Sequence, residues 1–215
     1  MEPFRPTIAE IDLKKYKNNL LAVKNYLPQK VKLMAIVKAN AYGHGAVEIA
    51  KAAENTGAEY LGVASLGEAL ELRSASIKLP ILILSETNHA HLERVIDANL
   101  TQTIYTFEEA QILSDICQNK KKRVKIHIKI DTGMSRVGVL PEKALELTTK
   151  ITKLPNIEIE GVFTHFSNAD DKNNEFTNIQ FSKYMKIVDE IKKLGIKIPL
   201  LHAANSAAMI NFPQT

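Results

Sequence analysis

The sequence predicts an α/β protein in which parallel strands alternate with helices, and a (β/α)₈ barrel of the TIM type is the best match. Short segments rich in Val, Ile and Leu recur along the chain, with amphipathic segments between them. Several of the apolar segments show no alternation with polar residues, as is typical of strands covered on both faces. An open, doubly wound sheet is the alternative, but no Gly-x-Gly-x-x-Gly follows the first strand.

The first predicted element is a helix over residues 11–28, which Pro28 ends. Seven strands are predicted after it, over residues 32–38, 60–65, 80–85, 102–106, 123–130, 157–165 and 198–205. One helix is predicted between each pair of consecutive strands, and another begins at Asn205. The count is one strand short of eight. We therefore expect residues 1–215 to be a single, incomplete barrel domain, truncated after the seventh strand, from a longer protein.

Composition favours a soluble globular protein, with 45% hydrophobic and 24% charged residues. The net charge is only +4, and the basic run Asn119–Lys125 has no interleaved aromatic residues, so a solvated loop is favoured over a nucleic-acid site. Cys117 is the single cysteine, which rules out an internal disulfide and indicates a buried helix position. No apolar run reaches a membrane span and no signal pattern opens the chain, so we expect a cytoplasmic protein.

The active site of such a barrel lies at the carboxyl ends of its strands. The predicted strand ends and the loops after them carry a set of candidate site residues: Lys38, Tyr42, Leu84, Lys129, Arg136, His165, His202, Asn205 and Ser206. Because they come from several strands, we expect these groups to face one mouth.

Lys38 ends the first predicted strand and runs into a loop of small residues with a tyrosine, a histidine and two glycines. A lysine amine partly shielded from water is a nucleophile suited to Schiff-base chemistry with a carbonyl. The alternative is a lysine that extends along apolar surface to reach solvent. Position alone does not separate the two interpretations.

The other candidates have equally plain alternatives. Asn205 and Ser206 stand at a strand-to-helix turn, which suits either a phosphate seat or an ordinary N-cap. Arg136 lies in a glycine-bearing loop where it could bind a phenolate or carboxylate, or could simply be a surface arginine. Lys129 could be a solvated strand lysine and His165 a satisfied core histidine. The histidines show no zinc spacing, so no metal site is predicted.

Four segments occur in order along the chain: "MAIVKANAYGHG", "KIDTGMSRVG", "VFTHFSNAD" and "LHAANSAAM". Together they resemble the N-terminal barrel of the alanine racemases, pyridoxal 5′-phosphate enzymes of fold type III. "RPTIAEIDL" near the start also resembles the opening of that family. The resemblance extends from about Phe4 to the last residue, and it implies the interconversion of L-alanine and D-alanine for peptidoglycan precursor supply.

The resemblance implies a role for each matching position. Lys38 would carry pyridoxal phosphate covalently and act as the base on one face of the substrate α-carbon. Tyr42 and Ser206 would bind the phosphate, and Leu84 would flank the pyridine ring. His165 and Asn205 would line the cofactor pocket.

Three further roles concern groups around the ring and the substrate. Arg136 would hydrogen-bond the phenolic oxygen of the cofactor and help to bind the substrate carboxylate. Lys129 matches a lysine that is often N-carboxylated and then orients the arginine. His202 would support an arginine facing the ring nitrogen.

That arginine, the second catalytic base (a tyrosine) and a Gly-Ile pair of the phosphate seat would all lie after Thr215. We therefore expect the 215 residues alone to lack full activity and the full-length protein to be a homodimer with alanine as substrate. Two alternatives remain: a non-catalytic, single-domain protein that binds pyridoxal phosphate, and an amino-acid decarboxylase of the same fold type.

Overall fold

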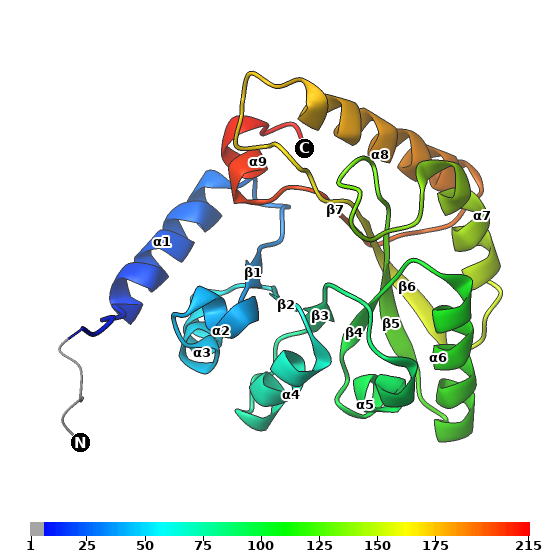
Figure 1. Ribbon diagram of the computed structural model, residues 1–215, viewed down its shortest axis with the longest axis horizontal. Helices are drawn as coiled ribbons and strands as arrows, with labels where there is room; N and C mark the ends of the chain where they lie inside the picture. The colour runs from blue at the N-terminus through cyan, green and yellow to red at the C-terminus, as the bar shows by residue number, and fades with distance from the viewer. Residues whose placement is uncertain (1–6) are drawn as a thin grey trace. The chain divides into compact units, whose positions relative to one another are not determined.

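In the computed structural model, residues 7–215 are described, and they contain seven parallel strands that follow one another in chain order, β1 to β7 (Figure 1). Helices separate the strands, so the prediction of a truncated (β/α)₈ barrel is confirmed at the level of element order and sheet topology. The chain divides into two compact units, Met1–Ile81 and Leu82–Thr215, called here the N-terminal and the C-terminal unit. Each is described by itself.

The described part of the N-terminal unit contains two strands and four helical segments before β3. In chain order they are α1 (Leu13–Tyr26), β1 (Met34–Ile36), α2 (Lys38–Tyr42), α3 (Ala46–Thr56), β2 (Tyr60–Val63) and α4 (Leu66–Ser74). Strands β1 and β2 pair in parallel, with Met34 opposite Tyr60 and Ile36 opposite Gly62. Asp12 is the N-cap of helix α1, and its carboxylate accepts hydrogen bonds from two backbone N–H groups of the first turn.

The C-terminal unit continues β3 (Ile81–Ile83), the strand that spans the division. The elements after it are the 3₁₀ turn η1 (His89–His91), α5 (Leu92–Asp97), β4 (Thr101–Ile104), α6 (Phe107–Lys120), β5 (Val124–Lys129), α7 (Pro141–Ile151), β6 (Ile157–Phe163), α8 (Phe176–Lys193), β7 (Leu200–His202) and α9 (Ser206–Asn211).

Strands β3 to β7 are all parallel, and β3 and β4 are buried along their whole length. This agrees with the continuous apolar pattern that predicted them. Strand β6 carries an irregularity against β5: Ile126 pairs with Ile159 and His127 with Gly161, so Glu160 is an extra residue in β6. Such a β-bulge redirects the side chains around it.

The structure differs from the sequence prediction mainly at element ends. The first strand covers three residues rather than 32–38, because the chain turns at Lys38. The last strand stops at His202 rather than at residue 205, because the following residues lead into the cap of α9. Two helical segments, α2 and α3, stand between β1 and β2 where one helix was predicted.

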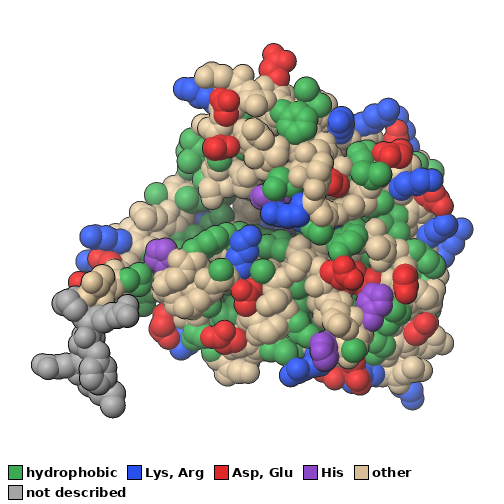
Figure 2. Space-filling model, viewed as in Figure 1, with side chains coloured by type: hydrophobic (Ala, Val, Ile, Leu, Met, Phe, Trp, Pro, Cys, Tyr) green, Lys and Arg blue, Asp and Glu red, His purple; other side chains and the backbone are tan. Residues whose placement is uncertain are grey.

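The expected burial of Cys117 is confirmed, whereas the basic run is a loop only in part: Asn119 and Lys120 end α6, and Val124 and Lys125 begin β5. Cys117 is fully buried on α6. Within the basic run, Lys120 and Lys122 both pair with Asp97, at 2.7 and 3.0 Å. On the face seen in Figure 2, basic and acidic side chains are interspersed. Among the described residues, no helix has the length and apolar character that crossing a membrane requires.

Candidate active site

Lys38 begins a left-handed turn rather than ending a strand. Ala39, Asn40 and Ala41 have φ of 51°, 54° and 50°, and Tyr42 has φ of 55°. Left-handed conformation costs an L-residue about 1–2 kcal/mol because Cβ crowds the following carbonyl oxygen. A run of four such residues without glycine persists only where its surroundings hold it, and strain of this kind gathers at functional sites.

Three hydrogen bonds that involve side chains help to hold this turn in place. The Glu68 carboxylate on α4 accepts from the backbone N–H of Ala39 at 2.7 Å. The Asn40 side-chain oxygen accepts from Ala46 N–H at the start of α3, at 2.8 Å. The His44 ring donates from Nδ1 to the Ala41 carbonyl at 2.8 Å. The turn after Lys38 is therefore tied to α3 and α4, the two helices that follow it in sequence.

The turn brings Lys38 and Tyr42 together. The Lys38 amine lies 6.0 Å from the centroid of the Tyr42 ring. Lys38 is half-buried, whereas the Tyr42 side chain is 60% exposed. Within residues 7–81, no hydrogen bond or ion pair ties up the Lys38 amine. The Lys38 amine and the exposed phenol ring of Tyr42 thus lie near each other.

In the C-terminal unit, Arg136 lies in a loop that Asp131 organises. The Asp131 carboxylate accepts from the backbone N–H groups of Gly133 and Ser135, both at 3.0 Å. Gly138 has φ of 141°, and a Cβ there would lie 2.7 Å from the Asp131 nitrogen. Glycine is therefore required at this close approach. Arg136 itself is exposed.

Lys129 is buried, with only 4% of its surface exposed, so the interpretation as a solvated strand lysine is wrong. Its ammonium lies 5.4 Å from the centroid of the Phe163 ring. Phe163 in turn stacks on His202, with centroids 4.6 Å apart and an interplanar angle of 7°. Residues from β5, β6 and β7 therefore form one packed group.

His202 also contacts a second histidine. Its Nε2 lies 2.8 Å from Nδ1 of His127, a fully buried residue of β5. Desolvation, followed by the neighbouring His127, lowers the pKa of His202 to about 3. His202 is therefore a neutral imidazole throughout the physiological range.

Asn205 and Ser206 stand at the start of α9 as predicted. Asn205 is the N-cap: its side-chain oxygen accepts from Ala208 N–H at 2.9 Å. This matches the plain capping alternative and occupies one free N–H of the helix start. Ser206 is exposed.

A buried glutamine hydrogen-bonds to the backbone at or next to each of two candidates, Leu84 and His165. Gln102 donates from Nε2 to the carbonyl of Ser85, the residue after Leu84, at 2.9 Å. Gln180 donates from Nε2 to the His165 carbonyl at 3.1 Å. Both candidate side chains are half-buried. The loops that carry them are thus fixed from within the fold.

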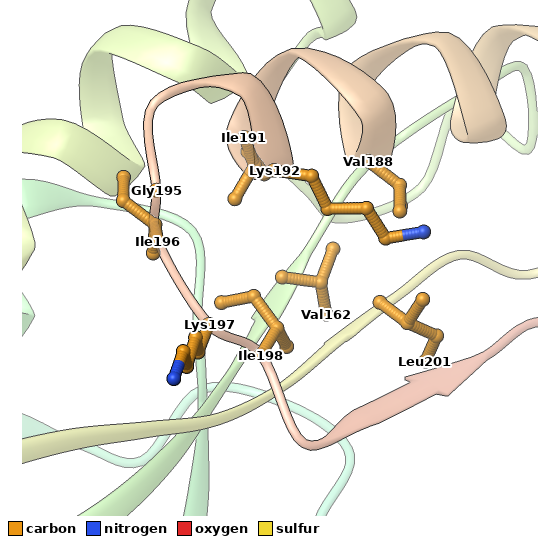
Figure 3. Close-up of a pocket in the computed structure, with 9 residues that line it drawn as sticks. All are labelled: Val162, Val188, Ile191, Lys192, Gly195, Ile196, Lys197, Ile198 and Leu201. Atoms are coloured by element: carbon orange, nitrogen blue, oxygen red, sulfur yellow. The ribbon is translucent and has the colours of Figure 1, made fainter.

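The C-terminal unit also contains an apolar pocket beside α8 (Figure 3). Its lining residues are Val162, Val188, Ile191, Lys192, Gly195, Ile196, Lys197, Ile198 and Leu201. The side chains are aliphatic apart from two lysines, and no sequence-predicted candidate is among them. The pocket is therefore distinct from the set of candidate residues.

Sequence reasoning missed His127, Glu160, Phe163 and Glu68. One signal was present: polar residues recur at every second position of β5, as Lys125, His127 and Lys129, so they share one face of the strand. A second signal was the Ser-x-x-Glu pattern at Ser65, which the structure shows as a capping box. The capping pattern does not indicate that the Glu68 carboxylate also binds the turn after Lys38.

Comparison with known proteins supports the family. The family model described as "Alanine racemase, N-terminal domain" matches residues 11–215. The alanine racemase of Methanococcus maripaludis is 45% identical over 98% of this chain, and that of Clostridium tetani is 42% identical over 98%. The chain covers only 57% and 54% of the lengths of these two relatives.

A solved structure agrees with these relatives. The alanine racemase of Clostridium difficile 630 in complex with cycloserine matches 99% of this chain with a TM-score of 0.95 and 39% identity, over 58% of its own length. Similarity of sequence and similarity of fold therefore indicate the same family. The chain belongs to the family of the alanine racemase N-terminal domain.

Proposed function

We propose that this chain is the cofactor-binding part of a pyridoxal phosphate-dependent alanine racemase, which interconverts L-alanine and D-alanine. The observation that carries the proposal is Lys38 at the start of a left-handed turn with Tyr42 beside it, in a chain of this family. The chain spans little more than half of its relatives, so racemisation is proposed for the full-length product of its gene.

The chemistry of the donor groups fits pyridoxal phosphate. An aldehyde requires an amine that no carboxylate holds, and Lys38 meets that requirement within residues 7–81. A phosphate requires hydroxyl and N–H donors, which Tyr42 and Ser206 supply as exposed side chains. A phenolic oxygen requires a cation, and Arg136 is exposed on an ordered loop. Each of these roles is assigned to a single residue on the basis of the family resemblance.

When bound, pyridoxal phosphate withdraws electrons from the amino-acid α-carbon and so acidifies its proton. Lys38 would hold the cofactor and, through Nζ, would take the α-proton from one face of the substrate or return it there. Arg136 would hydrogen-bond the phenolic oxygen of the cofactor and help to bind the substrate carboxylate. Racemisation also needs a base on the opposite face, which we assign to no residue of this chain.

The remaining residues would orient rather than react. Leu84 would bound the ring on one side, and His165 and Asn205 would line the pocket. Lys129, if N-carboxylated, would offer Arg136 a negative partner. We further propose that the full-length enzyme is a cytoplasmic homodimer that supplies D-alanine for peptidoglycan precursors.

The test of cofactor attachment uses borohydride reduction of the 215-residue chain with pyridoxal phosphate, followed by peptide mass mapping. We expect one dominant covalent mark, on Lys38. Lys38→Arg should remove it, whereas Lys51→Arg, which changes an exposed lysine on α3, should not. A folded chain that saturates with cofactor and yet carries no mark on Lys38 would refute the assignment.

Racemisation is tested separately on the full-length gene product. In deuterated water, L-alanine should exchange its α-hydrogen and give D-alanine. A parallel assay for carbon dioxide release from basic amino acids distinguishes the decarboxylase alternative, and release of carbon dioxide without racemisation would favour it.

A further inference from the structure

A chain of side-chain contacts runs across three strands of the C-terminal unit and ends on His202. Lys125 binds one oxygen of Glu160 at 2.6 Å, and the other oxygen lies 3.2 Å from Nε2 of His127. Nδ1 of His127 then contacts Nε2 of His202 at 2.8 Å. Both nitrogens of the His127 ring are therefore engaged, one by a carboxylate and one by a histidine.

The β-bulge in β6 builds this chain. Glu160 is the extra residue where the register between β5 and β6 shifts, and it is only 8% exposed although it is an acidic residue. The next residue, Gly161, lies against the His127 ring: a Cβ there would come within 2.6 Å of Nδ1. The bulge and the glycine together place a carboxylate and an imidazole side by side in the interior.

The ring of His202 is also fixed in plane. It stacks on Phe163 with an interplanar angle of 7°, while the hydrogen bond to His127 sets its rotation about that stack. A ring held by both a stacking face and one nitrogen presents its remaining nitrogen, Nδ1, in one direction only.

The proton positions follow from the partners. A carboxylate only accepts, so Nε2 of a neutral His127 must carry the proton that faces Glu160. Nδ1 of His127 is then the acceptor, and Nε2 of His202 must donate to it. A neutral imidazole carries one N–H, so Nδ1 of His202 is left unprotonated. The Lys125 ammonium already balances the Glu160 charge, so His127 is not needed as a cation.

We propose that Glu160, acting through His127, holds His202 in the Nε2-protonated tautomer, so that its Nδ1 can only accept a hydrogen bond. Glu160 and His127 are thereby positioning residues, and the group that pairs with His202 must be an N–H or O–H donor rather than a carboxylate or carbonyl. The relevance to catalysis rests on the proposed racemase function; the tautomer itself does not.

The experiment is a long-range ¹H–¹⁵N correlation spectrum of the 215-residue chain, with ¹⁵N-labelled histidine, at pH 8 and without cofactor. The sequence has six histidines, and single His→Gln variants assign their signals. We expect His127 and His202 each to show one protonated nitrogen, Nε2, and one unprotonated nitrogen, Nδ1. A protonated Nδ1 on His202, or two protonated nitrogens on His127, would overturn the proposal.

Variants then separate a specific role from general packing. Glu160→Leu removes the acceptor and should convert His202 from one dominant tautomer to a mixture of both. Glu158→Gln, on the same strand but exposed, should leave the His202 pattern unchanged. An unaltered His202 pattern in folded Glu160→Leu would contradict the proposal. If that variant does not fold, the tautomer of His202 in the wild-type spectrum still tests the proposal.

The two proposals fail in different ways. Loss of the covalent mark on Lys38 with the expected tautomers present would refute the cofactor assignment alone. A normal mark on Lys38 with the opposite His202 tautomer would refute this inference alone.

Discussion

The Glu68 carboxylate accepts a hydrogen bond from the backbone N–H of Ala39 at 2.7 Å. Its other oxygen accepts from Ala64 and Ser65, at 2.6 and 3.1 Å, at the start of α4. One carboxylate therefore caps a helix and also holds the residue that follows Lys38. The position of the candidate cofactor lysine thus depends on a side chain 30 positions further along the chain.

Substitution of this carboxylate should loosen the Lys38 turn. In Glu68→Gln the charge-assisted hydrogen bonds weaken, and we expect the free energy of unfolding to fall by about 1–3 kcal/mol. Amide hydrogen exchange at Ala39 should accelerate, as measured by NMR. The matched control is Ser65→Ala, which removes the capping hydroxyl and costs about 1 kcal/mol but leaves the Ala39 contact intact. Equal exchange at Ala39 in both variants would contradict the link.

A second prediction concerns the effect of glycine in the left-handed turn on the free energy of unfolding. Ala39 has φ of 51° and ψ of 51°, a conformation that glycine adopts without steric penalty. We expect Ala39→Gly to be neutral or stabilising by up to about 1 kcal/mol in chemical denaturation, against the usual effect of glycine. Ala52→Gly in α3, with ordinary helical geometry, should instead destabilise by about 1 kcal/mol or more. Equal losses in both variants would mean that the turn is not left-handed.

The order of elements could be predicted from the sequence because it depends on local patterns. The apolar run at Ile81–Ile83 and the helical spacing before Pro28 each identify their element without knowledge of neighbours. Element ends were less predictable, as at Lys38, because the chain leaves the strand through a conformation that alanine and tyrosine rarely adopt. No sequence pattern specifies four left-handed residues without glycine.

The candidate residues could be named from motifs, but their partners could not. Lys129 lies under the Phe163 ring because β5 and β6 pair in one register, and the bulge at Glu160 changes that register by one residue. A single-residue shift moves a side chain to the other face of a strand. The contact between His127 and Glu160 therefore depends on an irregularity that alternation rules do not contain.

The close approach of Gly161 to His127 gives a third prediction. A methyl group at this position would meet the buried ring within 2.6–2.7 Å, so the ring or the strand must shift. We expect Gly161→Ala to reduce the free energy of unfolding by about 1–3 kcal/mol and to displace the His127 NMR signals. Gly67→Ala in α4, where the nearest atom is 3.9 Å away, should stabilise by about 0.5–1 kcal/mol. Unchanged His127 signals in Gly161→Ala would count against the observed packing.

Glu109 on α6 is a buried acidic residue that the proposed reaction does not use. It is 1% exposed, and its Oε1 has no hydrogen-bond partner among the described residues. Desolvation first, and then the charge of Glu86, raise the pKa of Glu109 to about 8. Glu86 itself accepts a hydrogen bond from the Tyr105 hydroxyl at 2.6 Å, and the Thr87 backbone N–H donates to Glu109.

The raised pKa makes Glu109 a source of pH-dependent stability. Between its unfolded pKa of about 4.3 and its folded pKa of about 8, the folded state binds more protons than the unfolded state, so stability falls as pH rises through this window. The slope from this one group is at most about 1.4 kcal/mol per pH unit. In urea denaturation from pH 5 to pH 8.5, Glu109→Gln should flatten the curve and be more stable than wild type at the alkaline end. The control is Glu108→Gln, which changes an exposed neighbour and should keep the wild-type slope. A Glu109→Gln curve parallel to that of the wild type would show that the Glu109 carboxyl is ionised in the folded protein.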